Sequence, residues 1–158
     1  MMNRVALALV LLAVMAAIGC AGGETGGIVH PTWVGAEVEG NTVSIPASGV
    51  ESGKMLHFRV TGEGVSMAFM AYKLDEETYV RANVCPPCRS VGFSLEGGIL
   101  DCDTCHTKFN AATGNGITGS CKEYPKAGVE HSVSGGKITM EMDDLVTAYQ
   151  NTGSPGWP

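Results

Sequence analysis

The sequence predicts a mainly β domain, a small β-sandwich with two cysteine knuckles on hairpin loops and one short C-terminal helix. Three observations support this prediction. Glycine is abundant, with 22 among 158 residues, and turn signals recur about every eight to twelve residues. Apolar and polar residues alternate with the period of two that is typical of strands. A single segment near the C-terminus has helical spacing instead.

Seven segments are predicted as strands because their apolar residues alternate, or run together, between turn signals. They are residues 41–45, 55–60, 65–72, 78–84, 90–95, 99–100 and 138–142. Turns are predicted at residues 49–53, 61–64, 96–98 and 132–137. The chain is therefore expected to fold as a series of hairpins, and two of these strands lead directly into cysteine motifs.

The predicted helix follows the last strand. Leu145, Val146 and Tyr149 fall on one side at helical spacing, and Asp143 is placed to cap the helix N-terminus. The helix is expected to end before residue 151, and residues 152–158 are expected to form a frayed tail.

Residues 1–19 are predicted to be a signal peptide of the lipoprotein type and not part of the fold. Arg4 precedes an apolar run of about fourteen residues, which is too short to span a bilayer comfortably. Gly19 then stands directly before Cys20, as in a bacterial lipoprotein cleavage site. The mature chain is expected to begin at Cys20 with a lipid on its sulfur. Ordinary signal cleavage nearby, with loss of Cys20, is the alternative.

These signals divide the chain into a lipid-anchored flexible linker at residues 20–35 and a metal-binding β domain at residues 36–151. The protein is expected to be exported and to contact the membrane through its lipid anchor, on the periplasmic or extracellular face. The formal net charge of −6 argues against nucleic acid as a partner. No nucleophile motif or phosphate-binding loop is present, so no catalytic residue is predicted.

Two C-x-x-C motifs dominate the remaining sequence. Cys85 and Cys88 form the first, Cys102 and Cys105 form the second, and residues 89–101 separate them. Two thiolates three positions apart on a tight turn can both reach one ion. Two such knuckles supply the four soft sulfur ligands that suit zinc or an iron–sulfur cluster. In an exported protein, cysteines that are neither ligands nor attachment sites tend to oxidise.

Several other interpretations of the cysteines remain open at this stage. Cys102, Cys105 and His106 together form C-x-x-C-H, the haem c attachment motif. Two structural disulfides, or a thiol–disulfide redox protein that uses one C-x-x-C pair, are further alternatives. A zinc site that only holds the loops of a binding module together is another.

Two more residues near the knuckles are candidates for supporting roles. Cys121 is an odd fifth cysteine, which could be an additional ligand, a redox-active thiol or the partner in an intermolecular bond. His106 could donate a hydrogen bond to a ligand sulfur and raise the reduction potential, or it could simply face solvent.

The order of residues after the second knuckle resembles that of Rieske-type domains. Phe109, Gly114, Gly119 and Pro125 follow in turn before a final strand. In Rieske-type domains each cluster loop supplies a cysteine and a histidine. This chain departs from that pattern, because Cys88 stands where a histidine is expected. Replacing imidazole by thiolate lowers the potential of a cluster.

A larger part of the chain resembles the FtrD-like membrane iron–sulfur proteins. The resemblance rests on a strand ending in Ile45-Pro46, the segment 56–60, the two C-x-x-C motifs, Phe109, and the segment 119–125 that contains Cys121. Some members of the family accompany periplasmic iron-uptake permeases. The resemblance implies a cysteine-ligated metal centre that involves Cys85, Cys88, Cys102, Cys105 and Cys121, with electron transfer to or from iron. Ser120, where relatives often carry glycine, is a departure.

The sequence therefore predicts an exported, lipid-anchored protein with an iron–sulfur cluster, for which zinc and haem c are the alternatives. Electron transfer, linked to iron uptake or respiration, is the expected role. A redox partner protein or a membrane permease complex is the expected partner.

Overall fold

A computed structural model of the protein describes residues 27–157. The predicted signal peptide, residues 1–19, and the predicted lipidation site, Cys20, lie outside these described residues. The elements in chain order are β1 (Pro31–Val34), β2 (Glu37–Glu39), β3 (Thr42–Pro46), α1 (Ser48–Glu51), β4 (Met55–Gly62), β5 (Val65–Leu74), β6 (Glu77–Ala82), β7 (Phe93–Glu96), β8 (Ile99–Cys102), β9 (Lys108–Asn110), β10 (Gly116–Thr118), β11 (Ser132–Ser134), β12 (Lys137–Glu141) and α2 (Met142–Thr152).

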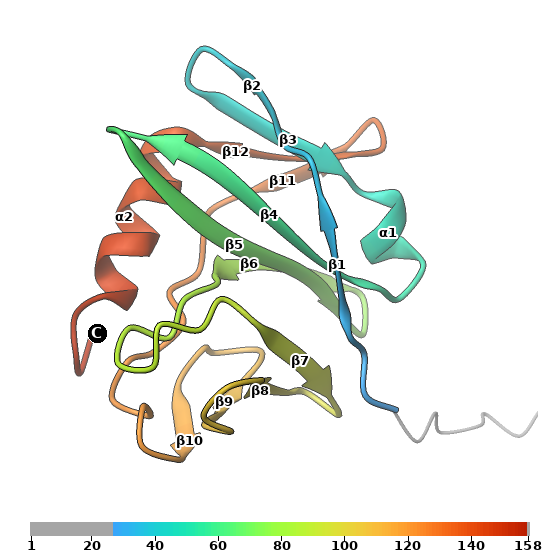
Figure 1. Cartoon of the computed structure of the whole chain (residues 1–158). Coiled ribbons are helices and arrows are strands. Elements are labelled where there is room, and N and C mark those ends of the chain that lie inside the picture. The colour runs from blue at the N-terminus through green and yellow to red at the C-terminus, as the bar shows by residue number, and fades with distance from the viewer. Residues whose placement is uncertain (1–26, 158) are drawn as a thin grey trace, which may run out of the picture.

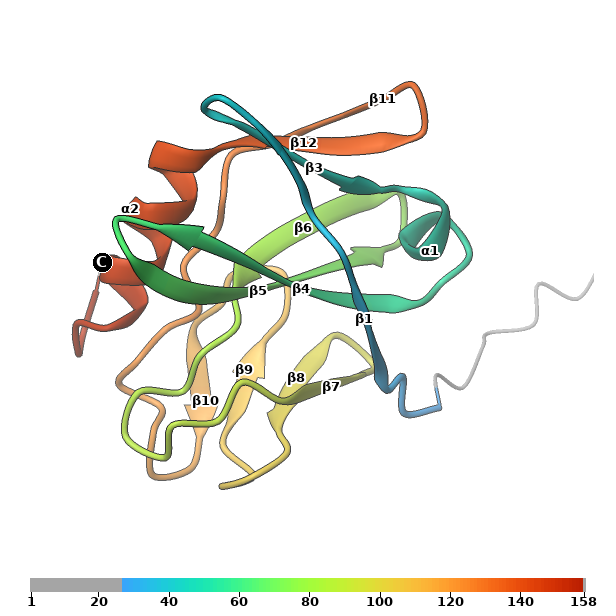
Figure 2. The same ribbon diagram turned by 45° about the horizontal axis from the view of Figure 1, so that its top comes forward.

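The strands form three four-stranded sheets (Figure 1). The central sheet has the order β1-β4-β5-β6, in which β4, β5 and β6 pair antiparallel and β1 runs parallel to β4. A second sheet has the order β11-β12-β3-β2, and a third has the order β10-β9-β8-β7. Figure 2 shows the central sheet between the other two. The predicted mainly β sandwich is thus confirmed.

The two faces of the central sheet build two separate hydrophobic cores, because alternate residues of a strand point to opposite faces. Met67 of β5 lies in the core shared with the second sheet and α2, whereas Met70 lies in the core shared with the third sheet. We call the latter the lower core. It contains Phe93 and Phe109 as well as three of the cysteines, Cys85, Cys102 and Cys121. The cysteine-bearing loops are thus packed over a hydrophobic base.

Helix α2 covers one side of the first core through the buried residues Leu145 and Ala148. It begins at Met142, with Glu141 in the N-cap position and no capping hydrogen bond from a side chain. The prediction that Asp143 caps this helix was therefore wrong. Asp143 instead lies in the first turn, where a negative charge interacts favourably with the helix dipole.

The folded chain extends further at both ends than the sequence boundaries indicate. Pro31–Val34, inside the expected flexible linker, forms β1 and pairs with β4. At the other end, the Thr152 hydroxyl accepts a hydrogen bond from the Ala127 amide at 2.9 Å, and Trp157 packs against the first core. The structure differs from the predicted linker and frayed tail at these residues because tertiary contacts override local composition.

Six elements are absent from the sequence prediction. The short strands β1 and β2 lie at the edges of their sheets, β9 and β10 complete the third sheet, and β11 and α1 overlap the predicted turns at residues 132–137 and 49–53. Within the part of the chain that the structure describes, neither helix has the length and apolar character needed to cross a bilayer.

Candidate metal centre

The first knuckle begins just after β6 ends. The Cys85 amide donates to the Ser90 carbonyl at 2.8 Å, and the Cys85 carbonyl accepts from the Arg89 amide at 2.7 Å. Arg89 has a left-handed φ of 60°, which turns the chain back on itself. The Cys88 sulfur lies 3.7 Å from the Cys85 carbonyl oxygen. This tight loop brings both sulfurs to the same side.

The second knuckle begins at the last residue of β8. The Cys102 amide donates to the Thr107 carbonyl at 3.0 Å, and the Cys102 carbonyl accepts from the His106 amide at 2.8 Å. His106 has a φ of 54°. The antiparallel pairing of Phe93 with Cys102 places this loop against the chain that leaves the first knuckle.

The four knuckle sulfurs converge on one point. The Sγ atoms of Cys85, Cys88, Cys102 and Cys105 all lie within 4.8 Å of one another. Pairs from different knuckles are 3.9 Å apart (Cys85 and Cys105) and 3.7 Å apart (Cys88 and Cys102). A tetrahedral ion with metal–sulfur bonds of about 2.3 Å holds its sulfur ligands about 3.8 Å apart. The observed spacing therefore fits a single tetrahedral ion.

Burial and mutual contact divide the four thiols by acidity. Hydrogen bonding to Cys102 and burial raise the pKa of the Cys85 thiol, whereas the same hydrogen bond lowers the pKa of Cys102 to about 4. Burial raises the pKa of Cys88 to about 11. The pKa values of neighbouring thiols are thus shifted in opposite directions. A cation at their centre would favour the thiolate form of all four, which is the form that binds metal.

The centre is buried on one side and accessible on the other. Cys85 and Cys102 are fully buried in the lower core, whereas Cys88 and Cys105 are partly exposed. An ion bound here would rest on the lower core and approach solvent through the second cysteine of each knuckle.

Cys121 lies beside this set but not within it. Its sulfur is 3.7 Å from the Cys105 sulfur, and its side chain is buried. Thr107 holds the two together, because its hydroxyl oxygen accepts from the Cys121 amide at 3.1 Å and lies 3.2 Å from the Cys105 sulfur. Cys121 is thus placed as a neighbour of a ligand position.

Sequence reasoning missed a buried lysine at this centre. Lys126 is 0% exposed, and its ammonium donates to the Val84 carbonyl, one residue before Cys85, at 2.8 Å. The ammonium also lies 4.4 Å from the ring centroid of Phe109. No signal in the sequence marks this lysine, because a single lysine in a loop ordinarily faces solvent.

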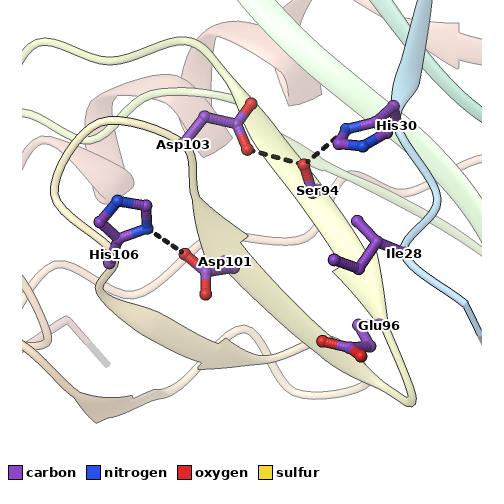
Figure 3. A pocket seen from close by; sticks show the side chains of 7 residues that line it. All are labelled: Ile28, His30, Ser94, Glu96, Asp101, Asp103 and His106. Carbon is purple, nitrogen blue, oxygen red and sulfur yellow. Dashed lines mark hydrogen bonds and ion pairs between the residues drawn. The ribbon is translucent and has the colours of Figure 1, made fainter.

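A cleft of about 330 Å³ opens beside the second knuckle. Figure 3 shows its lining residues Ile28, His30, Ser94, Glu96, Asp101, Asp103 and His106. The His106 side chain is 79% exposed and its Nδ1 lies 3.4 Å from Asp101 Oδ1. The Ser94 hydroxyl donates to Asp103 Oδ1 at 2.7 Å. The imidazole of His106 is thus paired with a carboxylate at the surface.

The sulfur geometry bears on the rival interpretations of the cysteines. The sulfurs of Cys102 and Cys105 each contact a sulfur of the other knuckle, so the second motif is part of a four-sulfur site and not an isolated haem attachment motif. All five cysteines among residues 27–157 are free thiols. The disulfide interpretation therefore lacks support. Over the same residues, the four-sulfur set is the only convergent group of three or more potential metal ligands.

Comparison with known proteins identifies the family. Residues 50–151, about two thirds of the chain, match the model of a family described as membrane iron–sulfur containing protein FtrD-like. The chain belongs to the FtrD-like family. No curated protein matches this FtrD-like chain.

Two solved structures are similar to this FtrD-like protein. One is from a complex of reduced oxygenase and oxidized ferredoxin in carbazole 1,9a-dioxygenase, with a TM-score of 0.54, 20% identity, and coverage of 66% of this chain and 95% of that chain. It shows the fold. The other is a Sphingomonas yanoikuyae B1 ferredoxin, with a TM-score of 0.44, 22% identity, and coverage of 52% and 83%.

The family and the four-cysteine set support an iron–sulfur cofactor. The residues present fit such a group, because four thiolates are the usual ligands of iron in these centres. The convergence of the four cysteine sulfurs is a structural observation that does not depend on the family match.

Proposed function

We propose that this FtrD-like protein transfers single electrons through an iron–sulfur centre held by Cys85, Cys88, Cys102 and Cys105. The convergence of the four sulfurs within 4.8 Å is the observation that carries the proposal. When bound, iron supplies the ferrous–ferric couple. The protein residues hold that couple in a fixed, largely buried sulfur environment, which is what sets a reduction potential.

The same spacing favours one iron over a multinuclear cluster. Thiolates on two different irons are separated by the iron–iron distance in addition to their own bonds, so they lie farther apart than thiolates on one iron. The distances of 3.7 and 3.9 Å between sulfurs of different knuckles match ligands of one ion. We therefore propose a one-iron, four-sulfur centre.

The accessible side of the centre is where an electron would enter or leave. Cys88 and Cys105 are partly exposed, whereas the lower core covers the opposite side. A redox partner is expected to dock over these two residues. The proposed partner is a redox protein or a permease complex of the same membrane, in line with the membrane family to which the chain belongs.

The proposed location is an exported, membrane-anchored lipoprotein on the periplasmic or extracellular face. The apolar run that ends at Gly19-Cys20 supports it. Cys20→Ser should shift the protein from the membrane fraction to the soluble fraction. Retention of the variant in the membrane would mean that something other than a lipid on Cys20 anchors it.

The test of the electron-transfer proposal is the metal content and voltammetry of protein purified without oxygen. We expect one iron per chain and a reversible one-electron wave within about −700 to +450 mV, the span of iron–sulfur centres. More than one iron per chain with inorganic sulfide would contradict the one-iron assignment.

A structural zinc site is the second candidate, because four thiolates with this spacing fit a tetrahedral zinc ion equally well. Colourless protein with one zinc per chain and no redox wave would favour zinc and exclude the electron-transfer role.

A further inference from the structure

Two cations are buried without carboxylate partners among residues 27–157. Lys126 is 0% exposed and Arg81 is 6% exposed. The ion pairs found among residues 27–157 include neither of them. A buried charge that lacks an opposite charge is costly to a fold. The structure must therefore supply negative charge to Lys126 in some other form.

The cysteine sulfurs of the lower core are the candidate negative groups for Lys126. Its ammonium lies over the rings of Phe109 and Phe93, with 4.4 and 5.6 Å to the centroids, and both rings belong to the lower core together with Cys85 and Cys102. Burial lowers the pKa of Lys126 to about 8, and the charges of the cysteine sulfurs oppose that fall. The cysteine sulfurs, packed in the same core, are therefore the counter-charges that we assign to Lys126.

The backbone of Lys126 is held from two sides. Arg81 Nη1 donates to the Lys126 carbonyl at 2.8 Å, and the Lys126 amide donates to the Gly114 carbonyl at 2.8 Å. Arg81 is fixed in turn by the carbonyls of Ala111 and Ala112. The Lys126 side chain then ends on the Val84 carbonyl, at the entry to the first knuckle. Its charge therefore has a fixed position relative to the centre.

Coulomb's law indicates which oxidation state of a bound iron ion the charge of Lys126 favours. Four thiolates and one ferric ion leave one net negative charge, and the ferrous form leaves two. A fixed positive charge in a medium of low polarity stabilises the more negative form more strongly. We infer that Lys126 is a positioning residue for the metal centre, which offsets thiolate charge and raises the reduction potential by stabilising the reduced form. This inference rests on the proposed electron-transfer function.

The test compares reduction potentials of metal-loaded variants. Lys126→Met removes the charge and keeps an apolar chain of similar length, and we expect its midpoint potential to fall below that of the wild type. Lys126→Arg keeps the charge and should stay close to the wild type. Lys122→Met is the matched control, because Lys122 is an exposed lysine of the same loop that pairs with Glu123. It should leave the potential unchanged.

The outcomes separate this inference from the proposed function. A wild type without a redox wave would overturn the electron-transfer role. A wild-type wave with an unchanged potential in Lys126→Met would overturn only the role of Lys126. A second readout does not depend on iron. Zinc-loaded Lys126→Met should lose its metal to a chelator faster than the wild type, and an equal rate would contradict charge compensation.

A measurement on the wild type covers the case in which Lys126→Met fails to fold. The side-chain NMR signals of Lys126 in zinc-loaded protein report directly whether the amine is charged. We expect an ammonium at pH 7. A neutral amine would overturn the inference, because an uncharged group cannot offset thiolate charge.

Discussion

Arg89 and His106 occupy equivalent places in the two knuckles. Each is the fourth residue after the first cysteine of its motif, and each has a left-handed φ, of 60° and 54°. Each backbone amide donates to the carbonyl of that cysteine, at 2.7 Å to Cys85 and 2.8 Å to Cys102. The next residue of each loop accepts from the amide of the same cysteine. The two knuckles therefore adopt the same backbone turn.

This equivalence gives the histidine after the second C-x-x-C motif a structural reason that does not require metal ligation. The position requires a backbone conformation that few residue types adopt easily, and histidine is among those that tolerate it. Its ring is exposed and faces Asp101. A motif that the sequence presents as C-x-x-C-H is therefore a knuckle followed by a turn residue.

The first prediction concerns His106. We expect His106→Asn to keep the metal, the visible spectrum and the reduction potential, with stability changed by no more than about 0.5 kcal/mol, because asparagine also tolerates this φ. His106→Val should cost about 1 kcal/mol or more, since a β-branched side chain is strained there. Metal analysis and urea unfolding measure both effects. Loss of sharp haem bands in His106→Asn would instead support axial ligation.

The second prediction separates the four knuckle cysteines from Cys121. Serine at any of Cys85, Cys88, Cys102 or Cys105 should abolish stoichiometric metal binding and lower stability by about 3 kcal/mol or more, because metal binding and folding are coupled. Cys121→Ser should keep one metal per chain, since its sulfur lies outside the convergent set. Metal content after gel filtration gives the measurement. Metal loss in Cys121→Ser would make it a ligand.

Much of the fold follows from local patterns, and the exceptions are informative. The alternation in residues 55–60 and the apolar run in residues 65–72 predicted β4 and β5. The two faces of these strands pack in the two different cores. The segment Pro31–Val34 is short and carries no such pattern. It becomes a strand because β4 offers a free edge, and that edge lies far along the chain.

The candidate site also has one part that local patterns predicted and one part that only tertiary contacts determine. Two C-x-x-C motifs predicted the meeting of four sulfurs, because spacing alone brings each pair to one side of a turn. The burial of Lys126 has no local signature. Its acceptor, the Val84 carbonyl, and its clamp, Arg81, belong to the end of β6 and the loop after it, more than forty residues earlier in the chain. The ammonium is enclosed only when the third sheet, which carries Phe93 and Phe109, packs against these residues.

The third prediction concerns His57, which is fully buried and has no hydrogen-bond partner at either ring nitrogen among residues 27–157. Burial, aided by Arg59, lowers the pKa of His57 from 6.5 to about 4. Because the folded pKa is depressed, the neutral ring supports the fold above pH 6.5. That support is lost as the pH falls from 6.5 to about 4, where the unfolded chain binds a proton that the folded chain excludes. The full loss in the free energy of unfolding is about 3 kcal/mol.

His57→Phe should therefore make stability less dependent on pH between about 4 and 6.5. The comparison is made with the wild type at each pH, so that acid-induced metal release affects both proteins alike. His106→Asn is the control, because His106 is exposed. A parallel decline of wild type and His57→Phe over this range would show that His57 does not contribute.

The fourth prediction compares two glycines that share a φ of 81°, Gly98 and Gly114. A Cβ on Gly98 would meet no atom of residues 27–157 within 4 Å, whereas a Cβ on Gly114 would clash with the Lys126 carbonyl oxygen and lie 2.7 Å from Arg81 Nη1. Gly98→Ala thus measures the backbone cost alone, about 1 kcal/mol. Gly114→Ala adds a clash with a backbone that cannot move without releasing Lys126. We expect this variant to lose about 3 kcal/mol or more in the free energy of unfolding.

The same pair of variants also reports on the metal centre. Gly114→Ala pushes on the hydrogen bond from Arg81 to Lys126, so it should accelerate metal loss to a chelator, whereas Gly98→Ala should not. Urea unfolding and chelator kinetics on the two metal-loaded proteins give both quantities. Equal destabilisation by the two alanines would mean that the loop carrying Lys126 yields easily, and the lysine would then lack the fixed position on which its electrostatic effect depends.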